Sequence, residues 1–175
     1  MKKYFLLVAV ALIFAWSSAT TSAANYTTNA VNVISINPFS LIDGLLNVTF
    51  EHKLSAKNSL TVNASYWGYE SYATGIGIGA SYRWYIDLFE EGKSATNGLS
   101  IGPRLQYYHW SYSWDNDWAD FSYSSLSLGV EIAYKWVFDN KWVVEPTLNY
   151  SFPIVKKSGY SFTDYGFGVN LGYAF

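Results

Sequence analysis

Apolar residues alternate with small or polar residues over segment after segment of this chain. In residues 165–175 every second residue is aromatic or aliphatic, and the residues between them are Gly, Asn or Ala. Successive side chains of a β-strand point to opposite faces, so this segment has one apolar face and one small, polar face. A strand in the wall of a transmembrane barrel has the same two faces, one toward lipid and one toward the lumen. The pattern predicts such a strand.

The same alternation recurs along most of the chain. It covers residues 46–54, 60–67, 75–85, 98–108, 125–136 and 142–152. A further strand around residues 29–36 is less regular, because Ile34 and Ile36 share a face with Asn32. Counting it gives about eight strands, the smallest common membrane barrel. The sequence predicts an all-β fold, an eight-stranded antiparallel transmembrane β-barrel of the outer-membrane type.

A soluble barrel with its apolar row turned inward is the competing fold. The aromatic row is too bulky for the narrow interior of such a barrel. The opposite row of Gly, Ser, Asn and Thr is a poor soluble surface, and Tyr and Trp gather at the strand ends, where interfacial girdles belong. These features favour the membrane barrel.

The first 24 residues have the pattern of a secretory signal peptide. Lys2 and Lys3 precede an apolar run over residues 4–16, and small residues follow as far as Ala24. The run is shorter than the roughly 20 residues of a membrane helix. We expect a cleaved leader, 1–24, and one barrel domain, 25–175. The chain has no cysteine, so disulfides do not staple it.

Charge and connections give the expected location and orientation. Without Lys2 and Lys3, nine basic residues stand against 13 acidic ones, a net charge of −4 in place of −2, and the absence of a basic patch argues against nucleic acid. An even strand number puts both mature termini on one side, which we expect to be the periplasmic side of the cell outer membrane. The expected periplasmic turns are 56–58, 87–96 and 139–140, and the expected outer loops are 37–44, 68–74, 113–120 and 156–164. The turn at 87–96 is long for its position.

Two prolines lie inside predicted strands. Pro103 and Pro146 each remove a donor from the ladder, so we expect a bulge or a local break at both.

Seven charged residues have the inward phase, which means that they fall at the alternate strand positions whose side chains are expected to point into the lumen. They are Glu51, Lys53, Arg83, Arg104, Glu131, Lys135 and Glu145. A charge in a narrow lumen needs a partner, because burying it alone costs several kcal/mol. We expect a paired network that fills the barrel. A proton or ion path is the alternative.

The sequence has one pair of residues whose spacing suggests catalysis, His109 and Ser111. Two residues apart on a strand, they share a face, and they resemble the His-x-Ser arrangement of outer-membrane lipid A deacylases. The chemistry would use His109 as base, Ser111 as nucleophile and a carboxylate such as Asp115 to orient the histidine. The flanking residues do not match those enzymes, so the expectation is that the chain is not an enzyme.

The predicted loop 113–120 concentrates aromatic and acidic side chains. They are Trp114, Asp115, Asp117, Trp118 and Asp120. Exposed aromatic residues can mark a contact surface for a sugar or a partner. Calcium is an alternative ligand, but the spacing lacks a full ligand set, so we expect no metal and no cofactor.

Two resemblances add to this interpretation. The run from Asn37 to Gly44, followed by Phe50-Glu51-His52, by residues 79–85 and by residues 98–103, resembles a small family of bacterial outer-membrane barrels of unknown function. A terminal aromatic residue such as Phe175 resembles the signal that the barrel assembly machinery recognises.

The predicted function is structural or surface-binding, exercised through the outer loops of a monomer with a filled lumen. Its expected partners are outer-membrane lipid, lipopolysaccharide and, during biogenesis, the assembly machinery. The alternatives are a lipid-acting enzyme using His109 and Ser111 and a narrow conduit for small solutes. Fold alone does not decide among them.

Overall fold

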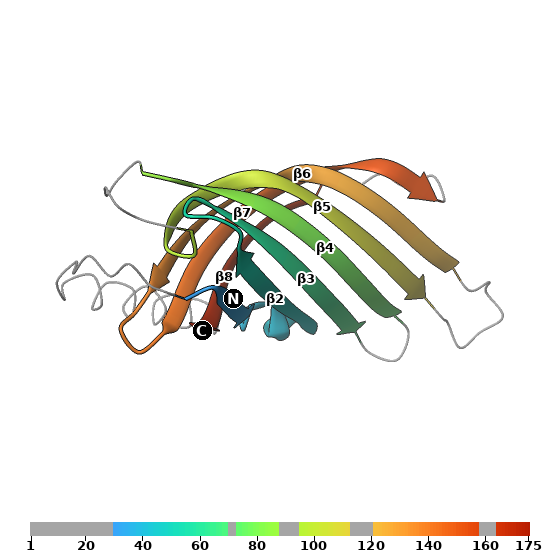
Figure 1. Cartoon of the computed structure of the whole chain (residues 1–175). Helices are drawn as coiled ribbons and strands as arrows, with labels where there is room; N and C mark the ends of the chain where they lie inside the picture. Colours follow the sequence, from blue (N-terminus) through green and yellow to red (C-terminus); the bar gives the residue numbers. More distant parts are fainter. Residues whose placement is uncertain (1–29, 70–72, 88–94, 113–120, 158–163) are drawn as a thin grey trace.

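Each strand of the chain pairs antiparallel with the next, and the last strand pairs with the first. A computed structural model describes residues 30–69, 73–87, 95–112, 121–157 and 164–175. The strands are β1 (Asn32–Ile36), β2 (Leu45–Lys53), β3 (Asn58–Tyr69), β4 (Ala73–Ile86), β5 (Gly98–Tyr112), β6 (Phe121–Val137), β7 (Trp142–Lys157) and β8 (Asp164–Ala174). They tilt together around the barrel (Figure 1), and the two ends of the described part meet at one end of it, where the Val31 amide donates to the Phe175 carbonyl at 3.1 Å. We call this the terminal end and the opposite one the far end. The predicted eight-stranded barrel is confirmed, whereas the leader 1–24 lies outside the described residues.

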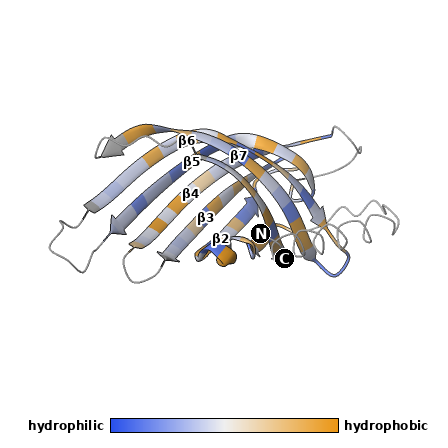
Figure 2. Cartoon of the chain, turned by 180° about the vertical axis from the view of Figure 1, so that it is seen from behind, coloured by the Kyte–Doolittle hydropathy of each residue, from blue (hydrophilic) through white to orange (hydrophobic). Residues whose placement is uncertain are grey.

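The apolar rows face outward. In β4, Ile76, Ile78 and Trp84 are exposed, and Ser81 and Arg83 between them are buried in the lumen. Hydrophobic and hydrophilic positions alternate along the other strands in the same way (Figure 2). A soluble barrel with an inward apolar row is therefore wrong.

The irregularity of the first strand has a local cause. Asn32 faces outward with Ile34 and Ile36, and its Oδ1 lies 2.8 Å from Nδ1 of the paired residue His52. Val33 and Ser35 point inward and are buried. The polar residue on the outer face is thus satisfied by its cross-strand neighbour.

Each of the two prolines interrupts the pairing of its strand with only one of the two neighbouring strands. Pairing of β4 with β5 stops after Ser81↔Arg104 and resumes at Trp84↔Ile101 in the same register, so the break lies opposite Pro103. The β6–β7 pairing likewise stops after Ala133↔Thr147 and resumes at Trp136↔Val144, a gap that contains Pro146. The expected local breaks are confirmed. A register shift lies elsewhere, between Leu126 and Ser127 and beside Pro153, where no irregularity was predicted.

The terminal end of the lumen is closed. Val33, Val143 and Ala174 form a buried apolar cluster there, with Ala30 and Val137 packed against it. Residues 95–98 are also buried, and Thr96 has a positive φ of 76°. The Ala95 amide donates to the Ala56 carbonyl at 2.7 Å. The described end of the long 87–96 connection thus packs into the barrel instead of forming an open turn.

One short 3-10 helix, η1 (Ser40–Asp43), lies in the predicted loop 37–44 at the far end. Asn37 Oδ1 accepts hydrogen bonds from the amides of Phe39 and Ser40 at 3.0 and 3.3 Å. Gly44, at φ +72°, ends the helix in the left-handed region that glycine tolerates. Among the described residues, no helix is long and apolar enough to span a membrane.

β1 is much shorter than its neighbours. It pairs with β8 only from Val33↔Ala174 to Ile36↔Leu171. The rest of β8, from Asp164 to Asn170, pairs with β7 on one side and has no described strand partner on the other. Among the described residues, the wall therefore has no strand pairing between this part of β8 and the segment that holds η1, although the Asn37 side chain lies close to Gly168.

Candidate functional site

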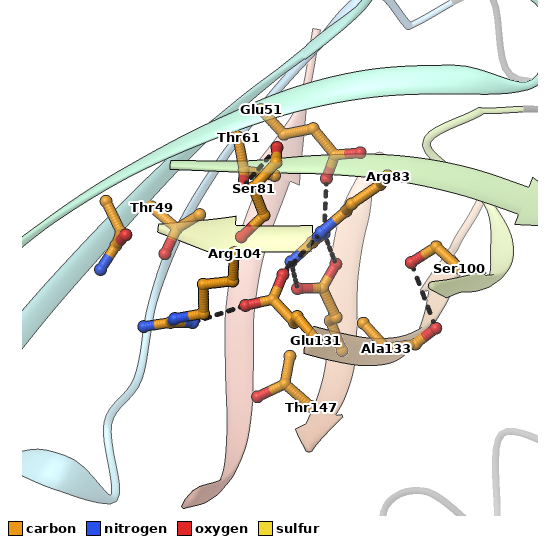
Figure 3. A network of polar contacts seen from close by, with 12 residues as sticks. Thr49, Glu51, Thr61, Ser81, Arg83, Ser100, Arg104, Glu131, Ala133 and Thr147 are labelled. Carbon is orange, nitrogen blue, oxygen red and sulfur yellow. Dashed lines mark hydrogen bonds and ion pairs between the residues drawn. The ribbon is translucent and has the colours of Figure 1, made fainter. Parts of the chain in front are cut away.

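Arg83 lies at the centre of a buried charge cluster in the lumen. Its Nε and Nη2 donate to Glu131 Oε1 at 2.9 and 2.7 Å. Its Nη1 donates to Glu51 Oε2 at 2.9 Å and to Glu145 Oε2 at 3.0 Å, and Nη2 also reaches Glu145 Oε1 at 3.2 Å. A guanidinium has five N–H donors. Those of Arg83 are matched by five hydrogen bonds to three carboxylates. Figure 3 shows Arg83 with two of them, Glu51 and Glu131.

Lys135 joins two of the same carboxylates from the terminal side of the cluster. Its Nζ pairs with Glu51 Oε2 and, at 2.8 Å, with Glu145 Oε2. The Tyr85 and Ser59 hydroxyls donate to Glu51 Oε1 at 2.6 and 2.5 Å. Every oxygen of Glu51 is therefore engaged.

Arg104 forms the far-end side of the cluster. Its Nη1 donates to Glu131 Oε2 at 2.5 Å, and its Nη2 donates to Gln106 Oε1 at 2.9 Å. Figure 3 shows Glu131 between Arg83 and Arg104. The Arg104 side chain is 12% exposed, against 2% for Arg83.

The cluster is electrically balanced and lies at the two breaks in the ladder. Three cations, Arg83, Arg104 and Lys135, face three carboxylates. Arg83 lies in the gap between β4 and β5, and Lys135 lies in the gap between β6 and β7. The prolines therefore interrupt the wall where the largest buried side chains need room.

Six of the seven inward charges predicted from the sequence come together in this way. Lys53 has the inward phase and is half-buried, but it forms no ion pair with a described residue. Sequence phase alone gives the face of a side chain. It does not give the position along the barrel axis at which possible ion-pair partners lie.

A polar chamber of about 480 Å³ lies between the cluster and the far end. Arg83, Arg104 and Glu131 line it at the cluster. Its walls are mostly amide and hydroxyl side chains, namely Asn47, Thr49, Thr61, Asn63, Ser81, Thr147, Asn149 and Asn170. The closed terminal end and the charge cluster make this a chamber without a described passage through the barrel.

The chamber borders the stretch of wall where β8 has no described strand partner on one side. It is lined on one side by Phe39, Ser40 and Asp43 and on the other by the β8 residues 165–168. Tyr165 and Phe167 have the outward phase and are 81% and 71% exposed, yet they border the same chamber. We call this unpaired stretch between η1 and β8 the side notch.

Two polar atoms in residues that line the chamber have no hydrogen-bond partner among the described residues. They are Nε of Arg104 and Oδ1 of Asn149. Buried polar groups normally have a partner, so such atoms call for an explanation. Sequence phase could place both residues in the lumen but could not show that they lack partners.

His109 pairs with a serine that sequence analysis missed. Its Nδ1 lies 2.9 Å from Oγ of Ser124, the residue opposite it on β6, and Tyr107 also donates to that hydroxyl at 3.4 Å. Ser111 lies two residues further along β5, opposite Ser122. The β5–β6 register, which the sequence did not give, identifies Ser124.

Several other predicted site residues are not placed. Trp114, Asp115, Asp117, Trp118 and Asp120 lie outside the described residues. Phe175 is half-exposed, and its backbone continues the seam with Asn32 through bonds of 2.9 Å in both directions. In the part of the chain that the structure describes, no three His, Cys, Asp or Glu side chains gather in a way that could hold a metal ion.

Comparisons with known proteins show a barrel fold. No protein-family model matches the sequence, and no curated protein matches it. The chain is similar to the N-terminal β-barrel domain of Pseudomonas aeruginosa OprF, with a TM-score of 0.51 and 12% identity over 85% of this chain and 98% of that one. It also matches the Yersinia pestis outer membrane protein Ail in a phospholipid nanodisc, with a TM-score of 0.49 and 13% identity over 84% of this chain and 100% of that one.

Proposed function

We propose that the chain is an integral outer-membrane barrel with a non-conducting lumen and a structural or surface-binding role. The outward apolar wall supports a membrane location, because a soluble protein rarely exposes so continuous an apolar surface. The barrel has the strand number of the smallest common membrane barrels.

The observation that carries the proposal is the blocked lumen. The charge cluster spans the interior, and the apolar cluster and residues 95–98 close the terminal end behind it. Each ion in the cluster is compensated, so moving it aside would leave partners buried without counter-charges. A narrow conduit is the weaker alternative for this reason.

We further propose that the far end is extracellular and that both mature termini are periplasmic. The connections 37–44, 113–120 and 158–163 at the far end are longer than the hairpins at 54–57 and 138–141, the asymmetry expected of such barrels. The long connection 87–97 at the terminal end and the short connection 70–72 at the far end are the exceptions. The acidic and aromatic residues of 113–120 would then be presented outside. In this proposal the protein is a monomer surrounded by lipid and lipopolysaccharide, and the assembly machinery recognises Phe175.

Planar-bilayer recording tests the blocked lumen. We expect the full-length protein, folded and inserted, to give no steady large conductance. A stable porin-like current from protein shown to be folded would contradict the proposal.

A lipid hydrolase is the alternative from another class. His109 and Ser124 provide a base and a hydroxyl, but no described carboxylate contacts His109, and strand amides at this site already serve the ladder instead of an oxyanion. Purified protein mixed with lipopolysaccharide should release no fatty acid. Release that Ser124→Ala or Ser111→Ala abolishes would establish the enzyme in place of the binder.

A further inference from the structure

The charges that line the chamber cancel. Arg83 and Arg104 contribute two cations, and Glu131 and Asp43 contribute two carboxylates. Glu131 accepts from both arginines, and all donors of Arg83 are matched. Asp43 lies at the far-end rim and is exposed to water. A charged ligand would lose hydration on entry without finding an unmatched counter-charge, so the chamber suits a neutral ligand.

The polar wall of the chamber offers neutral hydrogen-bond donors. Asn47 and Asn149 line it, and the Nδ2 atom of each makes no hydrogen bond with a described residue. Neither Nδ2 atom is among the buried atoms without a partner, so both are open to solvent. The Oδ1 atom of Asn47 is already engaged, because it accepts from the Thr49 hydroxyl at 3.4 Å. Two amide N–H groups are therefore available to a ligand.

The same wall offers hydroxyl acceptors. Thr49 donates to Asn47, and Thr147 donates to the Gly168 carbonyl at 3.4 Å. A hydroxyl has one donor and two lone pairs, so each threonine keeps its oxygen as an acceptor. Both threonines lie around Arg104 in the lumen (Figure 3). Amide donors beside hydroxyl acceptors match a ligand hydroxyl, which accepts and donates at once.

Aromatic surface completes the lining. Tyr108 and Phe39 border the chamber. A Cβ at Gly77 would lie 2.8 Å from the Tyr108 ring, so glycine lets this ring pack against the β4 backbone. The chamber volume of about 480 Å³ falls within the range of small-molecule sites, about 300–1,000 Å³. Rings beside hydroxyl-binding groups suit a sugar, because a sugar ring has apolar C–H faces as well as hydroxyls.

We infer that the chamber binds one neutral hexose unit of a glycan, which enters from the far end. Hexose hydroxyls accept from Asn47 and Asn149 and donate to Thr49, and a C–H face packs on Tyr108. This inference rests on the proposed surface-binding function and deepens it by naming a ligand class and a place for it.

Ligand-observed NMR titration of the full-length protein, folded in phospholipid nanodiscs, tests the inference. The neutral probes are the methyl glycosides of glucose, galactose and mannose. The charged analogues of each probe carry a carboxylate or an ammonium group on the same ring. We expect at least one neutral probe to bind with a Kd below about 1 mM, and its two charged analogues to bind at least about tenfold more weakly.

Variants on two strands locate the site. Asn47→Leu and Asn149→Leu should each weaken binding of the neutral probe about tenfold, because each removes an amide donor at similar volume. Asn140→Leu is the matched control, since it makes the same change in the 138–141 hairpin at the terminal end and should leave the affinity unchanged. Different gel mobilities of the unboiled and boiled protein verify that each variant is folded.

A second measurement keeps the test valid where a variant does not fold. In the parent protein with isotope-labelled asparagine, the probe should shift the side-chain NH₂ signals of Asn47 and Asn149 and leave that of Asn140 in place.

Three outcomes would overturn the inference. They are no binding of any neutral probe at about 10 mM, equal or tighter binding of a charged analogue, and parent-like affinity in both chamber variants. Failure of the blocked lumen is a separate result. A conducting barrel that binds the sugar contradicts the blocked lumen alone, and a silent barrel that binds no probe contradicts this inference alone.

Discussion

Lys135 and Lys53 have the same side chain and point to the same side of the wall, but their surroundings differ. Lys135 is buried and pairs with Glu51 and Glu145, whereas Lys53 is half-buried and pairs with no described residue. Removing one partner of a buried ion pair costs about 3–5 kcal/mol, because the other partner stays buried. We therefore expect Lys135→Met to lower the free energy of unfolding by about that amount, measured by urea unfolding in lipid.

Lys53→Met is the control for the same loss of charge at a site without an ion pair, and it should change the free energy of unfolding by less than about 0.5 kcal/mol. A similar effect of the two substitutions would contradict the role given to the cluster.

A second test at this scale removes two charges together. Glu145→Leu alone should also be destabilising, because it leaves Arg83 and Lys135 with one carboxylate fewer. Glu145→Leu combined with Lys135→Met keeps the cluster balanced, so the double variant should be less destabilised than the sum of the two single variants. Additive free energies of unfolding in the same urea experiment would show that the two residues are not coupled.

Residue-scale contacts were predictable only in part. A two-residue period gives the face of each side chain, so the inward phase of Glu51, Arg83 and Glu131 followed from the sequence. The partner of His109 did not follow, because it depends on the register between β5 and β6 across the connection 113–120. The unpartnered atoms of Arg104 and Asn149 depend on rotamers, which no periodicity encodes.

At the scale of elements, β6 carries a direct test of facing. Leu128 is outward and exposed, and Ser127 beside it is buried in the lumen. An arginine on the lipid side near the bilayer midplane costs about 2–4 kcal/mol, and near an interface about 0–1 kcal/mol. We expect Leu128→Arg to lower the free energy of unfolding in bilayers by the larger amount.

Leu54→Arg is the control for this prediction, because Leu54 is exposed just beyond the end of β2 and should give only the smaller, interfacial loss. Equal stability of Leu128→Arg and the parent would show that this face does not meet lipid.

The strands themselves were predictable because alternation repeats with a fixed period, and the breaks at Pro103 and Pro146 were predictable because proline lacks an amide donor. The buried position of residues 95–98 was not, since Ala95 and Thr96 carry no strong signal of burial and Thr96 adopts a positive φ. The end of β1 at Ile36 agrees with the strand predicted around residues 29–36, whereas β1 begins only at Asn32. Asn37 follows that end, and its side chain accepts from the amides of Phe39 and Ser40 at the start of η1.

The whole molecule depends on closure between its first and last strands, and closure has a covalent test. Ile36 and Leu171 are partners at the last rung of the β1–β8 seam, where paired Cα atoms lie about 4.5–5.5 Å apart. That separation suits a disulfide, and the chain has no other cysteine to compete. We expect Ile36→Cys with Leu171→Cys to form an intramolecular disulfide under mild oxidation, detected by mass spectrometry and by gel mobility with and without reductant.

Ile36→Cys with Phe167→Cys is the matched control, because Phe167 lies on the same face of β8 but four residues further along, about 13 Å away at 3.3 Å per residue. The control pair should stay reduced, since β8 has left β1 there and runs along the side notch. Efficient crosslinking of the control pair, or none at Ile36 and Leu171, would mean that the seam is longer or differently registered, and the notch would then lose its structural basis.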